Sequence, residues 1–222
     1  MRRAAGFSLM EVLAALALLT IVLLGVYSGI STATRIVRSG NQAIERMDEI
    51  RSAQNFLRAE LAQALIIPFG QNDDGDPIVF GGTEKTLRFV APMPGYLSKL
   101  GPQLQTVSLV DDDHGAYRLE VSLALLPPDG TDPQPIGEPE VLMRGIRKGA
   151  FAYRGVDEQN RPGDWQDTWD DGRRTPSLVR LTLDVDGNVA FPTLVAPLRI
   201  DPSASRNGFS TFGRVPRGQV MR

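Results

Sequence analysis

The sequence predicts an α+β fold in which one long N-terminal helix packs on an antiparallel β-sheet. Two observations predict it. An apolar run that reaches Ile30 continues at helical spacing to about residue 67, and Pro68 then ends the helical pattern. The chain beyond Pro68 consists of short alternating segments separated by Gly, Pro and Asp, which is typical of strands joined by turns. Once the apolar run is set aside, roughly 190 residues remain, which is enough for one domain with its own core.

The first half of the predicted helix, residues 7–30, has the length and composition of a membrane span. Val12 to Ile30 is almost entirely apolar, and about 20 such residues cross a bilayer as a helix. A cleavable secretory signal would have a shorter apolar core followed by small residues, whereas here the helical pattern continues beyond Ile30. Arg2 and Arg3 precede the run, which predicts a single pass with the N-terminus in the cytoplasm and the rest of the chain outside the inner membrane.

Glu11 is the charged residue inside this apolar run. A charge within a bilayer costs roughly 2.5–3.5 kcal/mol even on the mildest insertion scale. Because charges removed from water are usually paired, we expect Glu11 to meet a cation supplied by a partner.

The second half of the helix, residues 31–67, is amphipathic, and we refer to it as the stalk. Apolar or small residues recur on one stripe: Ile36, Gly40, Ile44, Met47, Ile50, Leu57, Leu61 and Leu65. Polar residues are expected on the other faces: Arg46, Glu49, Arg51, Arg58 and Glu60. One such stripe predicts packing against a neighbour, which makes Ile44, Met47 and Leu57 candidate interface residues. A signal anchor followed by an ordinary core helix fits the same periodicity.

The head, residues 68–202, is predicted to be a meandering antiparallel sheet. Asp73-Asp74-Gly75-Asp76-Pro77 predicts a turn before it. The predicted strands are Ile78–Phe80, Thr86–Ala91, Thr106–Val110, Tyr117–Leu125, Glu140–Met143, Ala150–Tyr153, Leu178–Val185 and Leu194–Ile200. Residues 203–222, rich in Ser and Gly, are expected to form a flexible tail.

Gly6 followed by Phe7-Ser8-Leu9-Met10-Glu11 resembles the N-terminal signal of the type IV pilin superfamily. In that superfamily a membrane prepilin peptidase cuts after the glycine and methylates the new amino terminus. The resemblance implies a cleaved leader at residues 1–6, cleavage between Gly6 and Phe7, and N-methylation of Phe7. It also implies a partner for Glu11, namely the amino terminus, at Phe7, of a neighbouring subunit in a filament. The implied fold is pilin-like.

Within that superfamily, the head resembles minor pseudopilin J of type II secretion systems. The resemblance rests on Phe151-Ala152-Tyr153-Arg154, a loop carrying Trp165 and Trp169, and the proline-led strand from Pro176 to Leu183. It implies a structural subunit at the tip of a periplasmic pseudopilus, without an active site of its own. The implied partners are the minor pseudopilins of the I, K and H types, the major pseudopilin, the prepilin peptidase and the inner membrane.

Several other classes of function are disfavoured by composition. The net charge is −2, so no electrostatic case for nucleic acid exists. The chain has no cysteine, which excludes disulfides and thiolate chemistry. His114 follows Asp111-Asp112-Asp113, a neighbourhood that could polarise a nucleophile but also fits a solvated turn. We expect no catalytic site and no cofactor. The alternatives are a minor pilin of a type IV pilus and a membrane-anchored periplasmic enzyme.

Two oxygen-rich segments raise the question of calcium. Asn72-Asp73-Asp74-Gly75-Asp76 lacks the spacing and closing Glu of an EF-hand. The second segment carries Asp164, Asp167, Asp170 and Asp171 around the two tryptophans. Turn chemistry explains both segments, so no metal is expected. Trp165 and Trp169, spaced by four, are candidate interface residues, although such residues more often cover the edge of a core.

Overall fold

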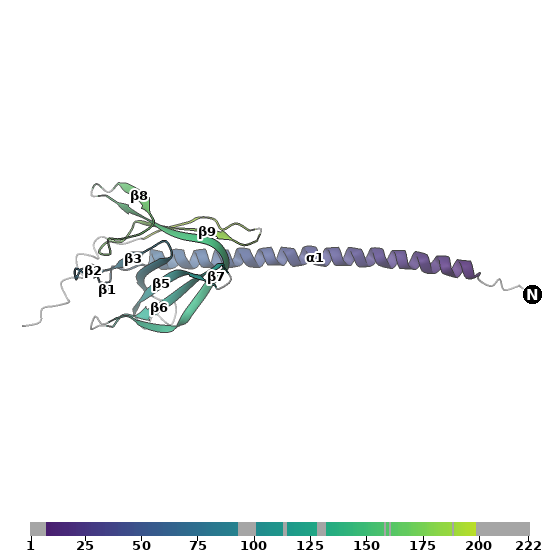
Figure 1. The fold of residues 1–222 in the computed structure, drawn as a ribbon, viewed down its shortest axis with the longest axis horizontal. Helices are drawn as coiled ribbons and strands as arrows, with labels where there is room; N and C mark the ends of the chain where they lie inside the picture. The colour runs from purple at the N-terminus through teal and green to yellow at the C-terminus, as the bar shows by residue number, and fades with distance from the viewer. Residues whose placement is uncertain are drawn as a thin grey trace, which may run out of the picture. The chain divides into compact units, whose positions relative to one another are not determined.

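The computed structural model describes residues 8–92, 101–112, 115–127, 132–157, 159, 161–187 and 189–198. The expectations for the leader, for Gly6 and Phe7, for His114 and for the tail therefore lie outside the described residues. The chain divides into two compact units, Met1–Met47 and Asp48–Arg222. Helix α1 (Leu9–Ala62) contributes residues to both units (Figure 1).

Helix α1 ends at Ala62, earlier than the expected boundary at residue 67. The amides of the next two residues bond back to the carbonyls of Glu60 and Leu61, at 3.1 and 3.3 Å, and close the last turn. The amide of Leu65 then donates to the carbonyl of Val90 at 2.7 Å. The hydrogen bond from Leu65 to the sheet therefore ends the helical conformation before Pro68 is reached.

The head carries an antiparallel sheet with the strand order β10-β9-β7-β6-β5-β4-β3, and β8 pairs with β7 off this path. Its strands are β3 (Phe80–Gly82), β4 (Thr86–Pro92), β5 (Pro102–Asp111), β6 (Tyr117–Leu125), β7 (Gln134–Val156), β8 (Pro162–Gln166), β9 (Leu178–Val185) and β10 (Leu194–Pro197). A separate two-stranded ribbon pairs β1 (Gly70–Gln71) with β2 (Pro77–Ile78). The antiparallel arrangement confirms the predicted fold class.

The prediction of two separate strands, Glu140–Met143 and Ala150–Tyr153, is wrong, because both segments belong to the single strand β7. It is one strand of 23 residues that changes partner along its length. Its first part pairs with β6, and from Ile146 onward it pairs with β9. Gly145, at a φ of 61°, lies where the partners change, so the glycine bends the strand instead of ending it.

Other strand boundaries also differ from the predicted ones. The predicted strand Ile78–Phe80 is divided at Val79, whose amide donates to the carbonyl of Gly172 at 2.8 Å instead of joining a ladder. Strand β5 extends beyond Thr106–Val110 at both ends. Strand β10 ends at Pro197, and the last two residues of the predicted strand lie outside the described residues.

The core of the head lies between the C-terminal part of α1, from Ile50 to Leu61, and the inner face of the sheet. We refer to this part of the helix as the outer part of α1. The helix contributes Ile50, Ala53, Leu57 and Leu61, all buried. The largest fully buried side chains of the sheet are Tyr153, Phe80, Phe89 and Phe151. Figure 1 shows strands β5 and β6 on one side of this part of the helix and β9 on the other. Leu57 is only 1% exposed, so it is a core residue and its prediction as an interface residue is wrong.

Candidate functional site

The start of α1 is set by local hydrogen bonding. Ser8 precedes the first helical residue, and its Oγ accepts the backbone N–H of Glu11 at 3.3 Å. The same N–H lies 3.1 Å from the carbonyl oxygen of Ser8. A serine followed three residues later by a glutamate is the sequence pattern of a helix N-terminus, and an acidic side chain in the first turn is favoured by the helix dipole. This cap was missed at the sequence level, although the spacing of Ser8 and Glu11 signals it.

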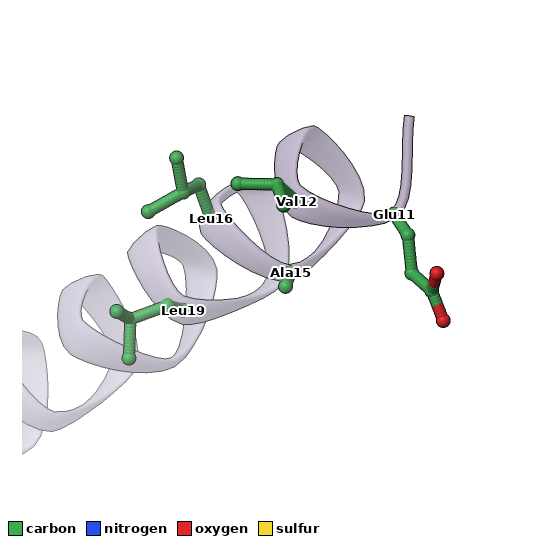
Figure 2. Close-up of a pocket in the computed structure, with 5 residues that line it drawn as sticks. All are labelled: Glu11, Val12, Ala15, Leu16 and Leu19. Atoms are coloured by element: carbon green, nitrogen blue, oxygen red, sulfur yellow. The ribbon is translucent and has the colours of Figure 1, made fainter. Parts of the chain in front are cut away.

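The Glu11 carboxylate lies on an apolar helix surface. Figure 2 shows it pointing away from the helix, with Val12, Ala15, Leu16 and Leu19 on the neighbouring surface. The next charged residue along the chain is Arg35, about 36 Å away at 1.5 Å per helical residue. A cation for Glu11 therefore cannot come from the following turns of its own helix.

The helix around Glu11 is apolar and uncovered. Within the described part of the chain, α1 is the one helix long and apolar enough to cross a membrane, by length and composition. Its large side chains from Leu9 to Ile30 are exposed in the single chain. A surface of this kind needs a bilayer or neighbouring subunits to cover it.

The candidate interface residues of the stalk divide into two groups. Ile44 is 54% exposed and Met47 is 37% exposed, and both belong to the first unit. Both side chains are exposed, whereas Leu57 is buried in the core of the head. The apolar stripe thus contributes to the core of the head from Ile50 onward, and its residues Ile44 and Met47 are exposed.

Of the two tryptophans, Trp169 is built into the head. Its ring packs against the core, and its indole N–H donates to the carbonyl of Arg174 at 2.8 Å. Its backbone N–H donates to the carbonyl of Gly82 at 2.9 Å. Trp169 therefore covers the edge of a core, which was the alternative weighed for it. Trp165, on β8, lies instead beside the guanidinium groups of Arg180 and Arg154.

The oxygen-rich segments are engaged in turns. Asn72 Oδ1 accepts the amides of Asp74 and Asp76 at 3.1 and 2.7 Å, and Gly75 has a φ of 81°. In the second segment, Asp171 lies 3.6 Å from the guanidinium of Arg173. Among the residues that the structure describes, no three His, Cys, Asp or Glu side chains are grouped to hold a metal ion.

A buried carboxylate was missed at the sequence level. Glu60, predicted to lie on a polar face, is only 2% exposed and accepts a hydrogen bond from Gln105 Nε2 at 2.5 Å. Burial raises the pKa of Glu60 above its ordinary value, and the hydrogen bond from Gln105 opposes this rise in pKa. Glu60 lies three residues after Leu57 and therefore on the same helix face as the core stripe, so its burial could have been predicted from this spacing.

Comparison with known proteins gives two family matches that together cover most of the chain. Residues 1–27 match the prokaryotic N-terminal methylation motif, and residues 28–196 match type II secretion system (T2SS) protein J. The type II secretion system protein J of Xanthomonas campestris pv. campestris is 34% identical over 200 residues, which are 88% of this chain and 93% of that relative. A chain in the crystal structure of the GspK-GspI-GspJ complex from the enterotoxigenic Escherichia coli type 2 secretion system has a TM-score of 0.48 and 19% identity, over 70% of this chain and 98% of that one.

Proposed function

The chain belongs to the protein J family of the type II secretion system, and we propose that it acts there as a minor pseudopilin at the tip of the pseudopilus. Members of this family are structural pseudopilins, so the chain works by assembly and is not an enzyme. The N-terminal methylation motif agrees with this role, because it extends into a helix that is apolar over a membrane-spanning length. The family match also favours secretion over the alternative of a type IV pilus.

The assembly mechanism that we propose begins at the N-terminus. Cleavage after Gly6 would leave Phe7 as the methylated first residue and would leave the Ser8 cap of α1 in place. Glu11 of one subunit would then pair with the amino terminus of its neighbour. In a low-dielectric surrounding, opposite charges about 4 Å apart attract strongly enough to offset much of the cost of burying them. The pair would set the axial register of neighbouring subunits.

The stalk would provide further contacts between subunits. Ile44 and Met47 are exposed apolar residues on the inner part of the stalk, which suits lateral packing against neighbouring helices. The outer part of α1 is committed to its own head through Leu57 and Leu61. Lateral packing is therefore proposed for the stalk before the head begins.

Partners and location follow from the same proposal. The chain would be a single-pass protein of the inner membrane, with its N-terminus in the cytoplasm and its head in the periplasm. Its partners would be minor pseudopilins of the I, K and H types and the major pseudopilin, after processing by the prepilin peptidase. Family membership and the apolar helix support this arrangement.

The observation that carries the proposal is Glu11, a carboxylate within the exposed apolar part of α1 and inside the matched methylation motif. The test is the intact mass of the chain isolated from membranes, with and without the prepilin peptidase. We expect loss of the first six residues and gain of one methyl group on Phe7 when the peptidase is present. An uncleaved chain in cells that contain the peptidase contradicts the proposal and revives an anchored periplasmic enzyme, whose function would survive mutation of Gly6 or Glu11.

A further inference from the structure

Three side chains form a cluster on the outer face of the head sheet. Arg154 of β7 lies opposite Trp165 of β8, and Ala152 of β7 lies opposite Arg180 of β9. Directly opposed residues of an antiparallel pair point to the same face, as do residues two apart on one strand. Arg154, Trp165 and Arg180 therefore share the face away from the core, and we refer to them as the Arg–Trp–Arg cluster.

The cluster has a defined geometry. The guanidinium carbon of Arg180 lies 4.4 Å from the centre of the Trp165 ring, and that of Arg154 lies 5.9 Å from it. The Nε–H of Arg154 also donates to the carbonyl of Gly163 at 2.7 Å. All three side chains are half-buried. The indole thus holds two cations in place at the surface, with part of their hydration removed.

Neither arginine of the cluster has a carboxylate partner among the described residues, whereas other arginines of the head do. The paired arginines and their partners are Arg118 with Glu120, Arg147 with Asp184, Arg161 with Asp157, and Arg173 with Asp76. Asp184 lies on the same face of β9 as Arg180, but it is held by Arg147. The cluster therefore presents two positive charges that the described residues of the chain do not neutralise.

An apolar surface lies beside the two charges. Val195 of β10 is directly opposite Arg180 and is 41% exposed. Tryptophan and arginine are the residues that most often carry binding energy at protein interfaces. A fixed guanidinium matches the two oxygens of a carboxylate, and the exposed valine and indole match an aliphatic side chain next to it.

We propose that the Arg–Trp–Arg cluster binds a carboxylate-bearing segment of a partner subunit, with an Asp or Glu at the guanidinium groups and an apolar neighbour on Trp165 and Val195. The inference rests on the proposed function, since it takes the partner to be another subunit of the same assembly. We choose an acidic segment because its carboxylate would complement the positive charges of Arg154 and Arg180. The exposed side chain of Val195 favours a protein segment, because an aliphatic side chain next to the carboxylate can pack on it.

The test is photo-crosslinking of the full chain in cells that contain the secretion system. One variant carries a photo-crosslinking residue at Val195, and another carries it at Ile44, where it reports assembly of the stalk independently of the head. We expect Val195 to crosslink to a partner segment that contains Asp or Glu. Arg180→Glu should lower this yield about tenfold, as expected for loss of a close charge pair. Arg180→Gln should lower it as well, and the control Arg173→Glu should not.

The outcomes separate the two proposals. Crosslinks from Ile44 with none from Val195, or crosslinks from Val195 only to lipid, to a second copy of this chain or to a segment without acidic residues, overturn the inference and leave the proposed function standing. Loss of crosslinks from both positions overturns both. Thermal unfolding of each Arg180 variant shows whether the head still folds. If Arg180→Glu unfolds the head, the test uses Arg180→Gln instead. An unchanged crosslinking yield from Val195 in a folded Arg180→Gln variant overturns the inference. An acidic-to-Lys change in the crosslinked segment should restore the yield of Arg180→Glu.

Discussion

The ring of Tyr153 lies directly against Gly82, so that a Cβ added to Gly82 would overlap Cζ of the ring. Gly82 ends β3 and Tyr153 lies on β7, far apart in the sheet order. The Tyr153 hydroxyl donates to the carbonyl of Thr83 at 2.8 Å, directly after this glycine. The turn between β3 and β4 is therefore held against the long strand, and the amide of Phe151 adds a bond to the carbonyl of Glu84 at 2.9 Å.

Gly82→Ala should destabilise the head, because the Tyr153 ring is fully buried and cannot move away from an added methyl group. Overpacking of this kind costs about 1–3 kcal/mol. Thermal unfolding of the full chain in detergent, followed by circular dichroism, measures the effect. Gly70→Ala is the control, because a Cβ there meets nothing within 4 Å. Equal unfolding temperatures for the two variants would show that the contact is not tight.

Tyr153→Phe should also destabilise the head, by a different mechanism. It keeps the ring but removes the hydroxyl that lies 2.8 and 3.1 Å from the carbonyls of Thr83 and Thr86. Loss of a partly buried hydrogen bond costs about 1–2 kcal/mol. Denaturant unfolding measures it, with Tyr27→Phe as the control because Tyr27 is 73% exposed on the helix. A Tyr153→Phe variant as stable as the Tyr27→Phe control would contradict the assignment.

Leu57→Ala and Ile44→Ala should have different effects, because one residue lies in the core of the head and the other is exposed on the stalk. Leu57 is 1% exposed in the core, so truncation should cost about 2–5 kcal/mol of head stability. Ile44 is 54% exposed, so its truncation should leave head unfolding within about 0.5 kcal/mol of the parent. Thermal unfolding measures both variants. We expect Ile44→Ala to weaken crosslinking between stalks instead, and a loss of head stability in this variant would contradict the division.

Much of the fold could be predicted from periodicity. The long helix was predicted, although it ends earlier than expected. The strands Tyr117–Leu125 and Leu178–Val185 were predicted with the boundaries that the structure has for them, because one-sided burial leaves a clear alternation. Strand β7 was divided wrongly, because Gly145 and Gly149 between the two predicted strands signal a turn locally, while pairing with β6 and then β9 keeps the strand extended. The short strands β1 and β8 were missed, because two to five residues carry no readable period.

The site could be predicted only in part. Glu11 stood out because a charge in an apolar run is conspicuous in any sequence. Leu57 and Ile44 share one stripe, and periodicity alone does not tell which end of a stripe meets the chain's own sheet. Arg154, Trp165 and Arg180 come from three strands, and only the pairing register brings them together.

Glu60 should make head stability depend on pH. Burial raises its folded-state pKa above the ordinary value of 4.5, so the folded state holds its proton more tightly than the unfolded state does. The associated stability is fully present below about pH 4.5 and is lost as the pH rises through the folded-state pKa. Glu60→Gln should remove this dependence, so the variant should gain stability relative to the parent as the pH rises. Denaturant unfolding of both proteins from pH 4 to pH 8 measures the difference, and a constant difference would contradict a raised pKa.

Glu11→Gln should impair assembly without affecting the head. Glu11 is exposed in the first unit, so its substitution should leave head unfolding unchanged. Glutamine keeps the size of the side chain and removes the charge, so it should lose a charge-assisted bond of about 1.5–3 kcal/mol to the neighbouring amino terminus. We therefore expect about a tenfold or greater loss of secretion and of stalk crosslinking. Glu45→Gln is the matched control, because Glu45 is also exposed on α1 but lies beyond the apolar run. Intact mass should show that Glu11→Gln is still cleaved after Gly6, so that failed processing is separated from failed pairing. Full secretion by a cleaved Glu11→Gln variant would remove Glu11 from the assembly mechanism.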